Sequence, residues 1–123
     1  MTVWRKLLGD QGEKMASAYL EKHGYKILDR NIRSRSGEID LIAMDGNTLV
    51  FCEVRTRGGR SLDQAAESID VRKQQRLTRL AEEYLQKHQE FSDHDCRFDA
   101  VLLQKEQDRW TLSLIADAFR PGW

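Results

Sequence analysis

Apolar and polar residues alternate over two neighbouring segments near the middle of the chain, residues 38–44 and 47–55. Successive side chains of a strand point to opposite faces, so both segments are predicted to be β-strands. The dipeptide Asp45-Gly46 between them favours a two-residue hairpin turn of type I′. One face of this hairpin is apolar throughout. The opposite face is apolar near the turn and charged far from it, which predicts a hairpin covered on both sides with a polar pocket at one end. The face that is apolar throughout carries Ile39, Leu41, Ala43, Val50, Cys52 and Val54.

Helical and strand periodicity place the remaining elements around this hairpin. Asp10 and Glu13 have the spacing of a capping box at a helix start. The further elements expected are a helix from Asp10 to about His23, a helix from Ser68 or Asp70 to about His88, and strands at residues 25–32, 97–103 and 110–114. Residues 1–9 and 116–123 are expected to form an arm and a tail. The order α-β-β-β-α-β-β predicts an α/β fold, with helices flanking a mixed sheet that has the hairpin at its centre.

The composition is that of a soluble globular protein with no electrostatic field over the whole molecule. The chain has 123 residues, 40% of them hydrophobic, and is expected to form a single domain over residues 1–123. Its 20 basic and 20 acidic residues cancel. No apolar run reaches the length of a membrane span, so no membrane partner is expected. Cys52 and Cys96 lack the spacing of a metal or redox motif and are expected to be reduced core residues of a cytoplasmic protein.

Two acidic residues on the charged part of the hairpin are candidates for a metal site. With a two-residue loop at Asp45-Gly46, Asp40 lies opposite Phe51 and diagonal to Glu53 on one face, with Cα atoms roughly 7–8 Å apart. A three-residue loop would put the two carboxylates on opposite faces, so the site depends on the parity of the turn. Partly buried carboxylates that converge repel one another unless a hard cation such as Mg²⁺ or Mn²⁺ joins them.

The neighbours of Glu53 extend this candidate site. The carbonyl of Val54 could add an oxygen ligand to the metal. Arg55 shares the face of Glu53, and its fixed positive charge suits a phosphate oxygen. Together these groups favour metal-assisted hydrolysis of a phosphodiester. The alternative interpretation is a set of solvent-exposed strand charges, with Glu38 or Glu53 in an ordinary ion pair with Arg55.

Glu13 and the basic residues near the hairpin each have two interpretations. Glu13 either only caps its helix or projects toward the pocket as a further carboxylate. Basic residues flank the charged end of the hairpin in sequence, and another lies near the start of the second helix. They are either solvated charges or a rim of phosphate contacts. As a rim, the candidates for nucleic-acid binding are Arg33, Arg35, Arg57, Arg60 and Lys73.

Four segments resemble those of the YraN family of small bacterial proteins. They are YLEKHGYKILDRNIR at residues 19–33, GEIDLIA at 37–43, LVFCEVRTR at 49–57 and RFDAVLL at 97–103. That family is similar to restriction endonucleases and archaeal Holliday-junction resolvases of the PD-(D/E)XK nuclease superfamily. The resemblance covers nearly the whole chain, with its most specific part at residues 37–57. It implies a restriction-endonuclease-like fold.

The superfamily pattern implies catalytic roles for the acidic residues named above. It has an acidic residue at the end of one strand and E-x-K on the next, which Asp40 and Glu53 match. Arg55 stands where the pattern has lysine, and an arginine keeps the charge but cannot release its proton. Glu13 resembles the acidic residue that resolvase-like members carry on a helix. The implied catalytic residues are Glu13, Asp40, Glu53 and Arg55.

Two functional hypotheses follow, both with DNA as the partner. The first is a Mg²⁺- or Mn²⁺-dependent nuclease acting on DNA, including branched or repair DNA. The second is a catalytically impaired, nuclease-like DNA-binding module, which Arg55 and the zero net charge favour. A structural or interaction protein with a vestigial site is a third, weaker interpretation. The protein is expected to be a monomer or a homodimer.

Overall fold

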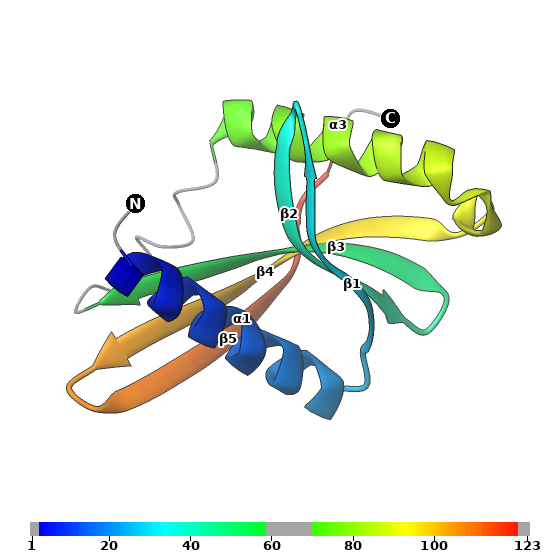
Figure 1. The fold of residues 1–123 in the computed structure, drawn as a ribbon. Coiled ribbons are helices and arrows are strands. Elements are labelled where there is room, and N and C mark those ends of the chain that lie inside the picture. The colour runs from blue at the N-terminus through cyan, green and yellow to red at the C-terminus, as the bar shows by residue number, and fades with distance from the viewer. Residues whose placement is uncertain (1–2, 59–69, 121–123) are drawn as a thin grey trace.

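A five-stranded mixed sheet with one helix on each face forms the described part of the chain (Figure 1). The structure is a computed structural model that describes the backbone of residues 3–58 and 70–120 and the side chains of residues 11–56 and 70–120. The elements are α1 (Val3–Lys22), β1 (Lys26–Ser34), β2 (Gly37–Asp45), β3 (Thr48–Gly58), α3 (Val71–Lys87), the short 3-10 helix η1 (Gln89–Phe91), β4 (Asp95–Glu106) and β5 (Arg109–Phe119). This order confirms the predicted α/β fold and agrees with the restriction-endonuclease-like architecture that the resemblance implies.

The strands lie in the order β1-β2-β3-β4-β5, so the predicted hairpin of β2 and β3 occupies the centre. Only β3 and β4 run parallel; the other neighbours are antiparallel. A parallel pair needs a crossover connection, and α3 lies in the segment that joins β3 to β4. Neither of the two α-helices in the described residues combines the length and apolar character that crossing a membrane requires.

Each face of the sheet has its own buried core, as the alternation in the hairpin predicts. On the α1 side, Ala16 and Leu20 pack against one set of inward-facing strand residues. That set includes Leu41, Ala43, Val50, Cys52, Val101 and Leu103. On the α3 side, Leu77, Leu80, Ala81 and Tyr84 pack against Ile42, Leu49, Phe51 and Phe98. Both faces of the hairpin are therefore covered.

The chain ends depart from the predicted arm and tail. Helix α1 begins at Val3, so Asp10 lies inside the helix and does not cap its start, and residues from Val3 onward are not an arm. Strand β5 continues to Phe119, and Phe119 packs against the α3-side core, so most of the expected tail is strand. Both errors arise because capping and turn residues inside an element were interpreted as its boundary; packing against the sheet extends the element past them.

The hairpin turn lies one residue further along than predicted. Asp45 pairs with Thr48, so the two loop residues are Gly46 and Asn47. Gly46 has φ of 61°, and Asn47 is not in the positive-φ region, which is the φ pattern of a type II′ turn, not the predicted type I′. The loop still has two residues, so the register moves by two positions and the paired residues 41–45 and 48–52 keep their predicted faces.

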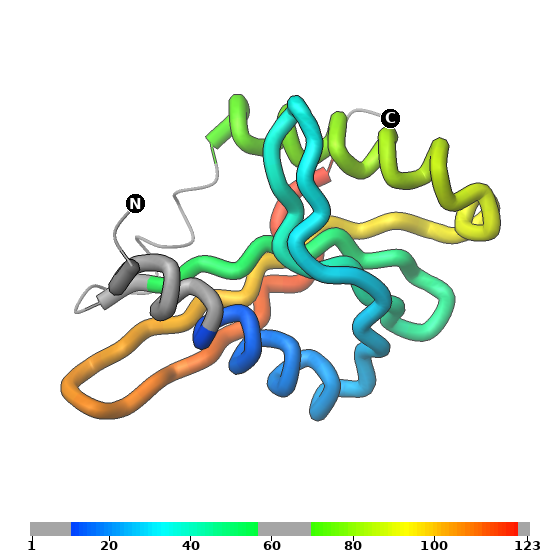
Figure 2. Tube along the Cα trace, viewed as in Figure 1, coloured from blue at the N-terminus to red at the C-terminus, as the bar shows by residue number. Residues whose placement is uncertain are grey.

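Strand β2 leaves β3 before its N-terminal end and bends toward α3, a path visible in Figure 2. The β2–β3 pairing ends at Leu41 and Cys52. The turn between β1 and β2 contacts α3, where Ser36 Oγ donates a hydrogen bond to Glu83 Oε1 at 3.1 Å. Ile39 lies in this bend and packs in the α3-side core, not on the α1 side as predicted. Strict alternation fails here because the strand rotates where its partner is lost.

Asp70 caps α3, and its loss should loosen the first turn of that helix. Its carboxylate accepts a hydrogen bond from the Lys73 N–H at 2.9 Å. We expect Asp70→Ala to lower the free energy of unfolding by about 1 kcal/mol, the usual cost of removing such a cap. Thermal unfolding measures this loss, and Asp70→Ser is the matched control because serine also caps. Equal stability of the two variants would contradict the assignment.

Candidate metal centre

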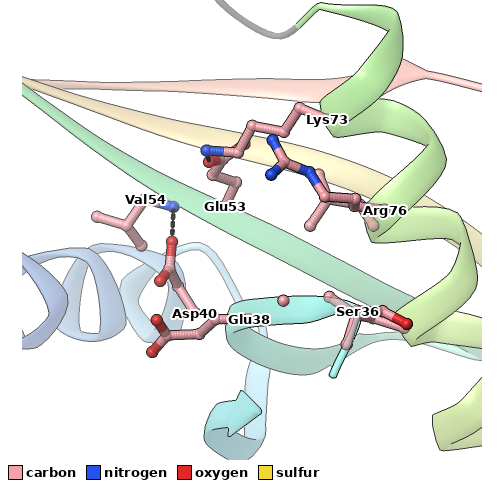
Figure 3. A pocket seen from close by; sticks show the side chains of 10 residues that line it. Ser36, Glu38, Asp40, Glu53, Val54, Lys73 and Arg76 are labelled. Atoms are coloured by element: carbon pink, nitrogen blue, oxygen red, sulfur yellow. Dashed lines mark hydrogen bonds and ion pairs between the residues drawn. The ribbon is translucent and has the colours of Figure 1, made fainter. Parts of the chain in front are cut away.

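An acidic cavity of about 330 Å³ opens where β2 separates from β3. Its walls come from the β1–β2 turn, from both central strands and from α3, whose Leu77 and Leu80 supply apolar surface. Its charged lining consists of Glu38, Asp40, Glu53, Lys73 and Arg76 (Figure 3). The pattern of the hairpin predicts a polar pocket at this end, and the cavity has that position.

The separation of the strands is what places Asp40 in the cavity. Continuing the observed register by one residue would put Asp40 directly opposite Glu53, and not diagonal to it as predicted. The backbone ladder stops before that pair. Instead, the Val54 N–H donates a hydrogen bond to Asp40 Oδ2 at 2.8 Å, drawn as the dashed line in Figure 3. A side-chain carboxylate therefore satisfies the backbone donor that the departing strand leaves.

Three carboxylates from two elements gather at this opening. One oxygen each of Glu13, Glu38 and Asp40 lies within 4.8 Å of the others. Glu38 and Asp40 are two residues apart on β2. Glu13 approaches from α1, which packs on the face of the sheet opposite to α3. Glu13 thus projects to the acidic cluster, which is the second of the two roles considered for it. Figure 3 shows the carboxylates of Glu38 and Asp40 close together, on the side of the cavity toward α1.

Glu53 is the most buried acid of the cavity and is only half satisfied. The residue is 6% exposed. Its Oε1 makes an ion pair with the Lys73 ammonium and lies 3.6 Å from Arg55 Nε. Its Oε2 is buried and accepts no hydrogen bond from any residue that the structure describes. A buried carboxylate oxygen without a donor is costly, and a bound cation would remove that cost.

Burial raises the pKa of Asp40 to about 7, although the Val54 N–H opposes the shift. The negative charges of Glu53, Glu13 and Glu38 raise the pKa further. The fold therefore disfavours the ionised form of Asp40 near neutral pH. A divalent cation reverses that preference, because it stabilises every carboxylate that contacts it. The donors are all hard oxygens, which fits Mg²⁺ or Mn²⁺ and not a metal that prefers sulfur or imidazole.

A second buried acid, Asp99, has the full set of hydrogen-bond donors expected of a carboxylate with a structural role. Asp99 on β4 has no exposed side-chain surface and is fully paired. Arg97 donates to it from Nε at 2.9 Å and from Nη2 at 3.1 Å, the Tyr25 hydroxyl donates at 3.0 Å, and the Asp117 N–H donates at 2.9 Å. Burial and the neighbouring Asp99 charge raise the pKa of Tyr25 to about 12. Glu53 has no comparable set of donors among the described residues, so its second oxygen keeps the capacity to bind a ligand.

The other predicted site residues have separate positions. Arg55 packs beside Glu53 with 12% of its side chain exposed and does not line the cavity. Val54 lines the cavity and donates its N–H to Asp40.

The basic residues predicted to bind nucleic acid lie at several places. Arg33 is exposed and pairs with Glu38 at 3.3 Å, so it borders the acidic cluster. Arg35 is exposed on the turn after β1. The side chain of Arg57 and all of Arg60 lie outside the described residues.

Sequence reasoning missed two charged residues of the cavity. Glu38 belongs to the carboxylate cluster, and its spacing of two residues from Asp40 on one strand was the available signal. Arg76 lines the cavity three residues after Lys73, one helical turn along α3. Neither spacing is informative without knowing that β2 bends toward α3.

Comparison with known proteins gives the family of the chain. A family model described as "Uncharacterised protein family UPF0102" matches residues 12–103, which include Glu13 and the cavity acids Glu38, Asp40 and Glu53. A UPF0102 protein of Magnetococcus marinus is 46% identical over 118 residues, 96% of this chain and 95% of that protein. One of Pelotomaculum thermopropionicum is 51% identical over 104 residues, 83% of this chain and 86% of that protein. The chain therefore belongs to the UPF0102 family, which is the YraN family that its sequence resembles.

Proposed function

We propose that this protein is a metal-dependent nuclease that acts on DNA in the cytoplasm. The observation that carries the proposal is the buried, unpaired Oε2 of Glu53 in a cavity that Asp40 and Glu38 also line, with Glu13 clustered against these two. Only the resemblance to the PD-(D/E)XK superfamily links this arrangement to DNA; the carboxylates themselves support a hard divalent cation. Asp40 and Glu53 are the proposed metal ligands, with the Val54 carbonyl and Glu13 as further oxygen donors.

Cations around the cavity supply the second requirement of phosphodiester hydrolysis. Lys73 and Arg76 line the same cavity as the acids, and Arg33 borders it through Glu38. Basic side chains hold phosphate oxygens, while a bound divalent ion polarises the phosphate and lowers the pKa of an attacking water. A groove used for binding alone gains nothing from four acids beside a phosphate, so the acids favour hydrolysis over simple binding.

A Mn²⁺ titration tests the metal site. We expect Mn²⁺ and Mg²⁺ to raise the melting temperature of the wild type by several degrees, since a ligand at about 100 times its Kd stabilises by about 2.7 kcal/mol. Asp40→Ala should abolish the rise, and Asp93→Asn, at an exposed acid outside the cavity, should keep it. A wild type whose melting temperature ignores both ions would contradict the metal site.

A second candidate function is a nuclease-like DNA-binding module without cleavage. The ion pair between Lys73 and Glu53 favours it, because a cation of the chain already neutralises one oxygen of that ligand. Incubation with branched, nicked and single-stranded DNA, with and without Mn²⁺, separates the two candidates. Products that require Mn²⁺ support the nuclease, whereas bound but intact DNA supports the module.

A further inference from the structure

Lys73 is the one lysine among the residues that line the acidic cavity, and its ammonium contacts the most buried acid there. It lies in the first turn of α3, where its own N–H is held by the Asp70 cap at 2.9 Å. Its side chain is 32% exposed, so the ammonium reaches both Glu53 and the open space of the cavity. Figure 3 shows its nitrogen directly beside the carboxylate of Glu53.

Arg55 stands in the sequence position of the superfamily lysine but does not have this geometry. Its side chain is largely buried beside Glu53, with 3.6 Å between its Nε and Glu53 Oε1, and it is absent from the cavity wall. The guanidinium is planar and spreads its charge over a wide fork. The ammonium of Lys73 is a compact charge with three donors, one directed at Glu53 and two available to a phosphate or a water in the cavity.

We infer that Lys73, and not Arg55, is the catalytic cation of this site, donated by α3 instead of by the strand that carries Glu53. The inference rests on the proposed nuclease function. In the hydrolysis, a water oxygen bonds to phosphorus and the phosphorus bond to one ester oxygen breaks. The water proton passes to solvent and the leaving oxygen takes up a proton. Lys73 keeps its own protons and donates hydrogen bonds to the phosphate oxygens, where negative charge builds up.

Arg76 provides the matched comparison for Lys73, because it lies on the same helix and lines the same cavity one turn away. No hydrogen bond or ion pair joins Arg76 to Glu53 among the described residues. We expect Lys73→Met to lower kcat by about 100-fold, as the loss of one donor to the transition state does, with KM changed by less than about threefold. Arg76→Met should mainly raise KM, since it removes a phosphate contact that persists through the reaction. Arg55→Met should cost less than about 10-fold in kcat.

A measurement of Mn²⁺ binding distinguishes a catalytic role of Lys73 from a structural one. Lys73→Met should bind Mn²⁺ at least as tightly as the wild type, measured by calorimetry, because a competing cation has been removed from Glu53. A variant that loses Mn²⁺ binding together with activity would make Lys73 a structural residue and overturn the inference. So would a Lys73→Met protein with wild-type kcat. A wild type that binds Mn²⁺ and cleaves no DNA overturns the proposed function and this role with it, whereas normal cleavage by Lys73→Met overturns the role alone.

Discussion

Asp40→Asn is expected to yield a protein that is more stable than the wild type at pH 8 in a chelator and no longer responds to Mn²⁺. The folded-state pKa of Asp40 is about 7, against 3.8 for an ordinary aspartate. Folding therefore takes up a proton between these pH values, and the ionised carboxylate destabilises the fold increasingly as the pH rises from about 4 to 7. Asparagine cannot ionise, and its side-chain oxygen can still accept the Val54 N–H.

The size of this gain follows from the shift. Each pKa unit corresponds to 1.36 kcal/mol, so the advantage of Asp40→Asn should be near zero at pH 4 and about 2–4 kcal/mol at pH 8. Chemical denaturation at the two pH values measures it, and Asp93→Asn is the control at an exposed acid. The same variant should lose metal binding and Mn²⁺-dependent cleavage. Destabilisation at pH 8 would show that the Asp40 charge is compensated in the metal-free fold.

Arg97→Met is expected to cost about 3–5 kcal/mol of unfolding free energy, the largest stability loss that the described ion pairs predict. Arg97 joins β4 to β2 and to the residue before β1: it donates to Asp99, to Asp45 Oδ2 at 2.9 Å and to the Tyr25 hydroxyl at 2.7 Å. Its removal leaves the carboxylate of Asp99 buried without a counter-charge. Hydrogen bonds to that carboxylate also raise the pKa of Arg97, so the guanidinium keeps its charge.

Arg120→Met is the matched control for Arg97→Met, because Arg120 also forms an aspartate pair at 2.9 Å but is 84% exposed. We expect this control to change stability by less than about 0.5 kcal/mol. Adding Asp99→Asn to Arg97→Met should recover part of the loss, since it removes the charge left unpaired. A loss below about 1 kcal/mol for Arg97→Met would mean that solvent reaches Asp99.

The cavity is a better candidate site than the Arg97 network, which consists of Arg97 and its partners Asp99, Asp45 and Tyr25. Both contain buried acids, and both were assembled from strands that are distant in sequence. In the network, every carboxylate oxygen of Asp99 meets a donor, so its chemistry is complete within the fold. In the cavity, one oxygen of Glu53 meets none among the described residues, and Asp40 is held with a raised pKa.

Sequence patterns alone were enough to give the element order and the two covered faces of the hairpin. Side chains alternate with a period of two, so a two-residue loop preserves the face of each paired residue even when the register moves by two. The shift from Asp45-Gly46 to Gly46-Asn47 therefore left residues 41–45 and 48–52 on their predicted faces. Local rules of this kind need no knowledge of distant segments.

The groups that surround the candidate site depend on how distant segments pack together. Ile39 packs in the α3-side core where β2 bends, Glu13 of α1 meets Glu38 and Asp40, and Lys73 of α3 pairs with Glu53. These contacts join segments that lie far apart in the sequence and meet because both helices pack against one twisted sheet. Neither propensity nor periodicity encodes such distances, since they follow from where the β2–β3 ladder ends and from what packs into the opening.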